Sequence, residues 1–197
     1  MMRGMSLLEL LVVLGLIGLF VVVSTSNLTA TQRQIDFDYF AREVVSSLEK
    51  CRWKAFQKRC YTGVLITQKP DNSYEFSFFQ DGNSNGIRTV DIHQGTDASI
   101  YRAIPIRRAS RDIEAAILKT AVPEIPPKTG TLSSEDPVKF GKSNIISFSP
   151  DGQSSSGTLY LACHSQKRMY AVVLYGPTAR ITLWKYSNQN WQMVGDR

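Results

Sequence analysis

The N-terminal segment constrains this 197-residue chain most, because one acidic residue interrupts a long apolar stretch there. The stretch runs from Met5 to Val23, follows Arg3 and Gly4, and contains Glu9 as its one charged residue. About 20 apolar residues are enough for a helix to cross a bilayer, so the sequence predicts a transmembrane helix. A carboxylate inside such a helix is costly, so Glu9 is expected to have a partner or a function.

Three interpretations of this segment are open. A secretory signal peptide would use Arg3 as its basic region and the small residues 24–26 as its cleavage site. A plain signal anchor would retain the segment. Neither interpretation explains Glu9. The third interpretation is a resemblance: a glycine, an apolar run and a glutamate five places after the glycine resemble the class III signal of type IV pilins and pseudopilins.

The resemblance implies how the N-terminus is processed. A prepilin peptidase would cut between Gly4 and Met5, release the leader 1–4 and methylate Met5. Glu9 would then be the fifth mature residue, which acts in assembly in that family. The family prefers Phe at the first mature position, and Met5 departs from that preference.

The helical pattern continues beyond the apolar stretch. Apolar residues recur at steps of three and four through the amphipathic segment 24–58, and no proline occurs before Pro70. We therefore expect one helix from about Ser6 to Gln57.

The pattern changes to that of β-strands after Arg59. Residues 61–67 and 74–79 are rich in β-branched and aromatic residues and flank a turn, which predicts a hairpin. Short strands are expected at 89–92 and 99–106, one or two helical turns at 111–118, and a loop at 123–130. The strands 144–149, 157–163, 168–174 and 179–186 predict a four-stranded antiparallel meander, with Trp191 capping the sheet.

Three elements of this β region resemble H-type minor pseudopilins of type II secretion and related minor type IV pilins. They are the Asp-x-Asn-x-Asn-Gly-x-Arg element at 81–88, the segment 146–152 with the following Gly157-Thr158-Leu159, and the hairpin at 176–181. The resemblance implies an α+β fold, with a long N-terminal transmembrane and amphipathic helix packed on an antiparallel β-sheet domain of two small sheets. The expected domains are the leader 1–4, the transmembrane half 5–23, the amphipathic half 24–58 and a periplasmic β domain 59–197 with a variable loop at 107–142.

The function implied is that of a minor pseudopilin, a structural subunit of the secretion pseudopilus that assembles through its N-terminal helix. The alternative is a minor type IV pilin that acts in pilus assembly, adhesion or DNA uptake. The implied partners are other pilins or pseudopilins, the prepilin peptidase and the inner-membrane assembly platform. The implied location is the inner membrane, crossed once, with the C-terminal domain in the periplasm.

One loop also matches the first half of an EF-hand calcium site. Asp81, Asn83 and Asn85 supply alternating oxygen ligands ahead of Gly86. The twelfth position is isoleucine rather than glutamate, and the nearest acid, Asp91, comes one place early. We predict no cofactor, with calcium as the alternative.

A net charge of +6 permits a nucleic-acid partner without specifying one. DNA-binding relatives carry a basic Gly-Arg-x-Arg element on the last hairpin, of which only Arg180 remains here. A second basic cluster consists of Arg102, Arg107, Arg108 and Arg111.

The three cysteines do not indicate an enzyme. Cys163 and His164 are adjacent, so on a strand they point to opposite faces and form no catalytic dyad. We predict that the chain is not an enzyme. Cys51 and Cys60 pair only if the helix stops between them, which leaves a disulfide open.

Overall fold

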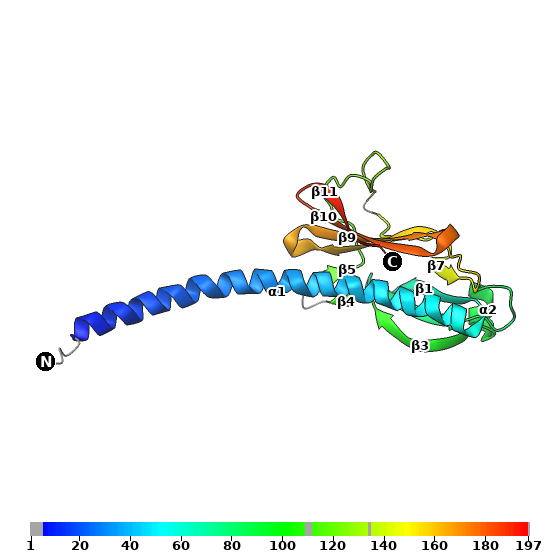
Figure 1. Ribbon diagram of the computed structural model, residues 1–197, viewed down its shortest axis with the longest axis horizontal. Coiled ribbons are helices and arrows are strands. Elements are labelled where there is room, and N and C mark those ends of the chain that lie inside the picture. Colours follow the sequence, from blue (N-terminus) through cyan, green and yellow to red (C-terminus); the bar gives the residue numbers. More distant parts are fainter. Residues whose placement is uncertain (1–5, 109–111, 134, 197) are drawn as a thin grey trace. The chain divides into compact units, whose positions relative to one another are not determined.

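The computed structural model describes residues 6–108, 112–133 and 135–196, without the side chains of residues 21–30, 166 and 196 (Figure 1). The chain divides into two compact units, Met1–Asp38 and Tyr39–Arg197. Helix α1 (Leu7–Lys58) contributes to both units. The second unit contains the rest of α1 and two β-sheets.

Helix α1 ends at Lys58, and the next residue leaves the helical backbone conformation. Arg59 adopts a left-handed φ of 50°, and its N–H lies 3.4 Å from the carbonyl oxygen of Phe56. This is the geometry with which many helices close. The predicted helix from about Ser6 to Gln57 is confirmed within one residue at each end.

The membrane-spanning part of the predicted fold class is wrong. Among the described residues, no helix has the apolar length that crossing a membrane requires. The predicted single-pass location in the inner membrane, with a periplasmic domain, is corrected for the same reason. The fold is a mixed arrangement of helix and antiparallel sheet.

The first sheet has the strand order β3–β2–β1–β7. Its strands are β1 (Thr62–Gln68), β2 (Tyr74–Gln80), β3 (Ala98–Pro105) and β7 (Ile145–Phe148). The predicted hairpin is confirmed, because β1 and β2 pair antiparallel from Thr62 opposite Gln80 to Gln68 opposite Tyr74. The predicted strand at 99–106 corresponds to β3.

The second sheet has seven strands in the order β11–β10–β9–β8–β5–β4, with β6 also paired to β8. Its strands are β4 (Arg107–Arg108), β5 (Ile113–Glu114), β6 (Val138–Lys139), β8 (Gly157–Cys163), β9 (Arg168–Tyr175), β10 (Arg180–Ser187) and β11 (Asn190–Asp196). The three predicted strands that correspond to β8, β9 and β10 are confirmed as antiparallel neighbours.

Two local predictions are wrong. Residues 89–92 belong to a short helix, α2 (Thr89–Gln94), which closes on Gly95 at a φ of 77°. Four residues are too few to separate the helical period from the strand period. The predicted helical turns after residue 111 are replaced by strand β5, which pairs with β8.

The predicted four-stranded meander has the wrong members. Strand β7 pairs with β1 in the first sheet instead of with β8. The fourth strand of the meander is β11, which contains Trp191 and pairs with β10. Trp191 belongs to this edge strand, and its ring packs on Tyr160 of β8 and Tyr186 of β10, so it covers part of the sheet as predicted.

The part of α1 that belongs to the second unit, from Tyr39 to Lys58, packs against both sheets (Figure 1). Val44 and Ser47 line a hollow with Phe76 of β2, whereas Val45 lines another with Ile181 and Leu183 of β10. Leu48, on the same part of the helix, is fully buried. This part of the helix is therefore the centre of the main core.

The opposite face of the seven-stranded sheet is covered by the segment 115–132. Along β9, Met169 and Ala171 face this segment. Five of its apolar residues join the same cluster: Ile117, Leu118, Val122, Ile125 and Leu132. The middle of the predicted variable loop is therefore a packed cover for the sheet.

Candidate functional site

The N-terminal part of α1 exposes large apolar side chains around its whole circumference. Every large hydrophobic residue from Leu7 to Phe20 is at least 47% exposed. These residues are Leu7, Leu8, Leu10, Leu11, Val12, Val13, Leu14, Leu16, Ile17, Leu19 and Phe20. A helix that is apolar on all sides is normally buried in a larger body. We call this segment, Leu7–Phe20, the apolar segment.

The Glu9 side chain has a hydrogen-bond partner at the start of α1, the backbone N–H of Ser6. Its carboxylate accepts a hydrogen bond from the Ser6 N–H at 3.1 Å, and the Ser6 hydroxyl accepts one from the Leu8 N–H at 3.3 Å. This reciprocal pair is a capping box at the start of α1. The Ser-x-x-Glu spacing before an apolar run was the sequence signal that identifies it. Gly4 and Met5, the predicted processing site, lie outside the described residues.

The loop after β2 is organised around Asp81, whose side chain is only 6% exposed. One carboxylate oxygen accepts the N–H groups of Asn83 at 2.9 Å and Ser84 at 2.8 Å, and the other accepts that of Gly86 at 2.8 Å. Gly82 lies so close to Thr96 that an added Cβ would be 2.1 Å from its carbonyl oxygen. Asp81 is therefore the hydrogen-bond acceptor at the centre of a tight loop.

A second buried carboxylate holds the other end of this loop. Asp97 accepts the Gly82 N–H at 3.3 Å and the Arg88 N–H at 3.2 Å. Asn83 accepts the Asn85 N–H at 3.3 Å through its side-chain oxygen. Backbone N–H groups of the loop therefore occupy both carboxylate oxygens of Asp81 and the amide oxygen of Asn83, which the calcium prediction assigned to a metal.

Asp91, the fourth residue of the calcium prediction, lies in α2 and is 9% exposed. Its Oδ2 is buried and has no hydrogen-bond partner among the described residues. No three His, Cys, Asp or Glu side chains in the described part of the chain converge as metal ligands. A calcium site at this loop stays a prediction.

Arg180, the predicted DNA contact, is exposed at the start of β10. It follows Ala179, whose carbonyl oxygen accepts a hydrogen bond at 2.9 Å from Arg52 of α1. In the second basic cluster, Arg108 pairs with Glu43 at 2.6 Å and Arg107 with Asp71 at 3.4 Å. These two arginines are thus partly neutralised within the protein. Arg111 lies outside the described residues.

Cys51, Cys60 and Cys163 all lie among the described residues, and none of them forms a disulfide in this structure. The Cys51 thiol points into the core and donates to the Thr62 hydroxyl at 3.4 Å. Burial raises the pKa of Cys51 to about 11, against the opposing effect of that hydrogen bond. A thiol with so high a pKa is a poor nucleophile near neutral pH.

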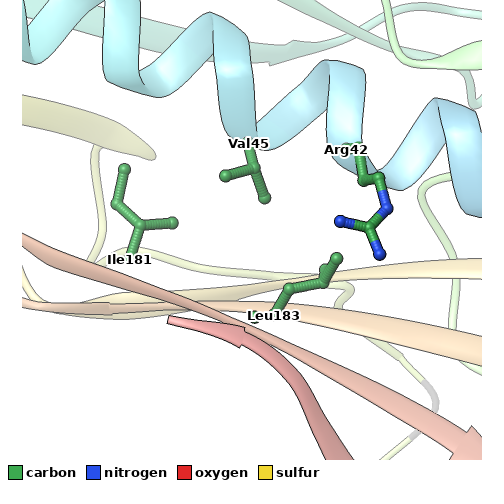
Figure 2. A pocket seen from close by; sticks show the side chains of 5 residues that line it. Arg42, Val45, Ile181 and Leu183 are labelled. Carbon is green, nitrogen blue, oxygen red and sulfur yellow. The ribbon is translucent and has the colours of Figure 1, made fainter. Parts of the chain in front are cut away.

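A small hollow lies between α1 and β10 in the second unit. Figure 2 shows Arg42 and Val45 reaching from the helix toward Ile181 and Leu183 on the strand. Its volume is about 40 Å³, which is enough for water and too small for an organic ligand. This hollow is a packing gap between helix and sheet.

Comparisons with known proteins add no family or fold assignment: no family model, curated protein or solved structure matches this chain.

Proposed function

We propose that this chain is a structural subunit of a filament, a minor pseudopilin of a type II secretion system, and that it assembles through its N-terminal helix. The observation that carries the proposal is the apolar segment, which exposes eleven large side chains on one helix. At about 25 cal/mol per Å², covering such a surface is strongly favourable. The neighbours that cover it would be the corresponding helices of other pilins or pseudopilins.

Two glycines support close packing of helices at this surface. An added Cβ at Gly15 or Gly18 would have no other atom within 4 Å, so both positions are open on the helix surface. Glycine lets another backbone approach closely. A neighbouring helix can therefore lie against this part of α1 without a steric conflict at either position.

Glu9 sets the axial position of the helix among its neighbours. After cleavage by the prepilin peptidase at Gly4, the mature Met5 would carry an amine. The Glu9 carboxylate would pair with the N-terminal amine of an adjacent subunit in a low-dielectric bundle, where removal of one partner is costly. In the isolated chain the same carboxylate accepts the Ser6 N–H.

Variants of the capping box separate the two roles of Glu9. Glu9→Gln keeps a side-chain acceptor for the Ser6 N–H but removes the charge. Ser6→Ala removes the cap, which costs about 1 kcal/mol, and keeps the charge. We expect Glu9→Gln to lower incorporation into sheared filaments at least about tenfold, since a broken charge pair in such a bundle costs several kcal/mol. Ser6→Ala should still be incorporated.

Incorporation is measured by immunoblotting the filament fraction of cells that express the chain with its assembly machinery. Mass spectrometry of the mature N-terminus checks that both variants are cut before Met5 and methylated. Wild-type incorporation of Glu9→Gln would rule out the charge pair. A mature terminus near Asn27 would rule out the filament proposal as a whole.

A further inference from the structure

A second site lies on the seven-stranded sheet, at the end opposite the β9–β10 turn. A cavity of about 630 Å³ lies here. It is lined by Thr120, Ala121 and Pro123, by Lys167 and Arg168 at the start of β9, and by residues 186–189 at the β10–β11 turn. This volume is within the range of small-molecule and peptide-binding sites. The hollow in Figure 2 is more than an order of magnitude smaller.

The described residues that line the cavity carry a net positive charge. Lys167 and Arg168 line it, and none of its described lining residues is acidic. Nη1 of Arg168 is buried and has no hydrogen-bond acceptor among the described residues. A buried guanidinium donor without an acceptor is unfavourable, so Arg168 has hydrogen-bonding capacity that the described residues leave unused.

The β10–β11 turn adds neutral donors to this wall. Asn188 and Gln189 both adopt left-handed backbone conformations, with φ values of 52° and 64°. In a two-residue turn of this kind, glycine is the favoured residue at the second position. Gln189 occupies this position at some conformational cost and lines the cavity together with Ser187.

We propose that this cavity binds a carboxylate-bearing ligand. Arg168 and Lys167 supply the positive charge, and Gln189 and Ser187 supply neutral hydrogen bonds. A planar carboxylate matches the fork of an arginine and provides a counter-charge. The carboxylate can belong to a free organic acid or to an acidic segment of another protein, and the site is independent of the filament proposal.

The test titrates the full-length chain with three probes. They are acetylated and amidated tri-glutamate, the matching tri-glutamine and free glutarate, each followed by calorimetry. The indole N–H of Trp191 donates to the Pro123 carbonyl at 2.8 Å beside the cavity, so its NMR signal reports local binding. The indole of Trp53, on α1, is the internal control.

We expect tri-glutamate to bind and tri-glutamine not to bind. Arg168→Gln and Lys167→Gln should each weaken binding about tenfold to hundredfold, because each removes a charge-assisted contact. Gln189→Gly should also weaken binding while relieving the turn, so unfolding cannot account for its effect. Lys142→Gln, an exposed lysine outside the cavity, is the matched control and should bind like the wild type.

Comparison of the probes identifies the source of the carboxylate. Glutarate that binds as tightly as tri-glutamate assigns the site to small acids, whereas binding of the peptide alone assigns it to acidic protein segments. Failure of both acids to bind overturns the proposal. So does binding that survives both Arg168→Gln and Lys167→Gln, or inorganic phosphate that displaces tri-glutamate with higher affinity than glutarate.

Discussion

Asp81→Ala should lower the free energy of unfolding by about 3–5 kcal/mol, because three backbone N–H groups lose an ionised acceptor at once. The alanine side chain has no hydrogen-bond acceptor. Because residue 81 is only 6% exposed, water can reach few of the three N–H groups to replace the lost hydrogen bonds. The measurement is urea denaturation followed by circular dichroism, with the midpoint and the slope compared between variant and wild type.

A second aspartate provides the control for this variant. Asp71 also accepts a backbone N–H, from Ser73 at 3.1 Å, but it lies in an exposed turn. The Ser73 hydroxyl and N–H, helped by Arg107, hold the pKa of Asp71 below its usual value. Asp71→Ala should destabilise much less than Asp81→Ala, since water can replace an exposed acceptor. Equal losses for the two variants would show that Asp81 does not organise its loop.

Leu48→Ala should destabilise the second unit by about 2–5 kcal/mol, the range for a buried leucine in a core that cannot collapse. Leu48 is fully buried in the part of α1 that packs on both sheets. Since alanine favours helix, the loss would come from the cavity and from lost apolar burial rather than from helix propensity. Thermal and urea unfolding should both report the change.

Leu11, in the apolar segment, allows the same leucine-to-alanine substitution to be made at an exposed position as a control. Leu11 is on the same helix and is 65% exposed. Leu11→Ala should change stability by less than about 0.5 kcal/mol, as is usual for exposed positions. If Leu11→Ala cost as much as Leu48→Ala, the apolar segment would already be buried in the isolated protein, and the basis of the assembly proposal would be lost.

Features that depend on neighbouring residues were predictable from the sequence. The β1–β2 hairpin follows from alternating side chains around a Pro-Asp-Asn-Ser turn, and both strands lie within two residues of the predicted bounds. Helix α1 follows from apolar spacing and the absence of proline. The Ser6–Glu9 capping box is equally local, but an interpretation of Glu9 as a charge within a membrane segment does not predict it.

Features that depend on distant partners were not predictable. Strand β7 has the composition of a meander strand, yet its partner is β1, about 80 residues earlier in the chain. The segment 115–132 contains proline and lacks a period, but it covers the outer face of the sheet. The cavity proposed to bind a carboxylate joins residues from three separate stretches of the chain. Lys167 and Arg168 form no sequence motif with the other residues that line it.

The apolar segment is the centre of this account, and its neighbours in the cell provide the most direct test. A photo-crosslinking amino acid at Leu16, which is 61% exposed, should form adducts in cells that assemble filaments. Mass spectrometry should identify the crosslinked peptides as N-terminal helices of other pilin-like subunits. The same amino acid at the exposed Lys142 is the control and should give no such peptides. Absence of helix adducts at Leu16, or equal adducts at both positions, would contradict assembly through this helix.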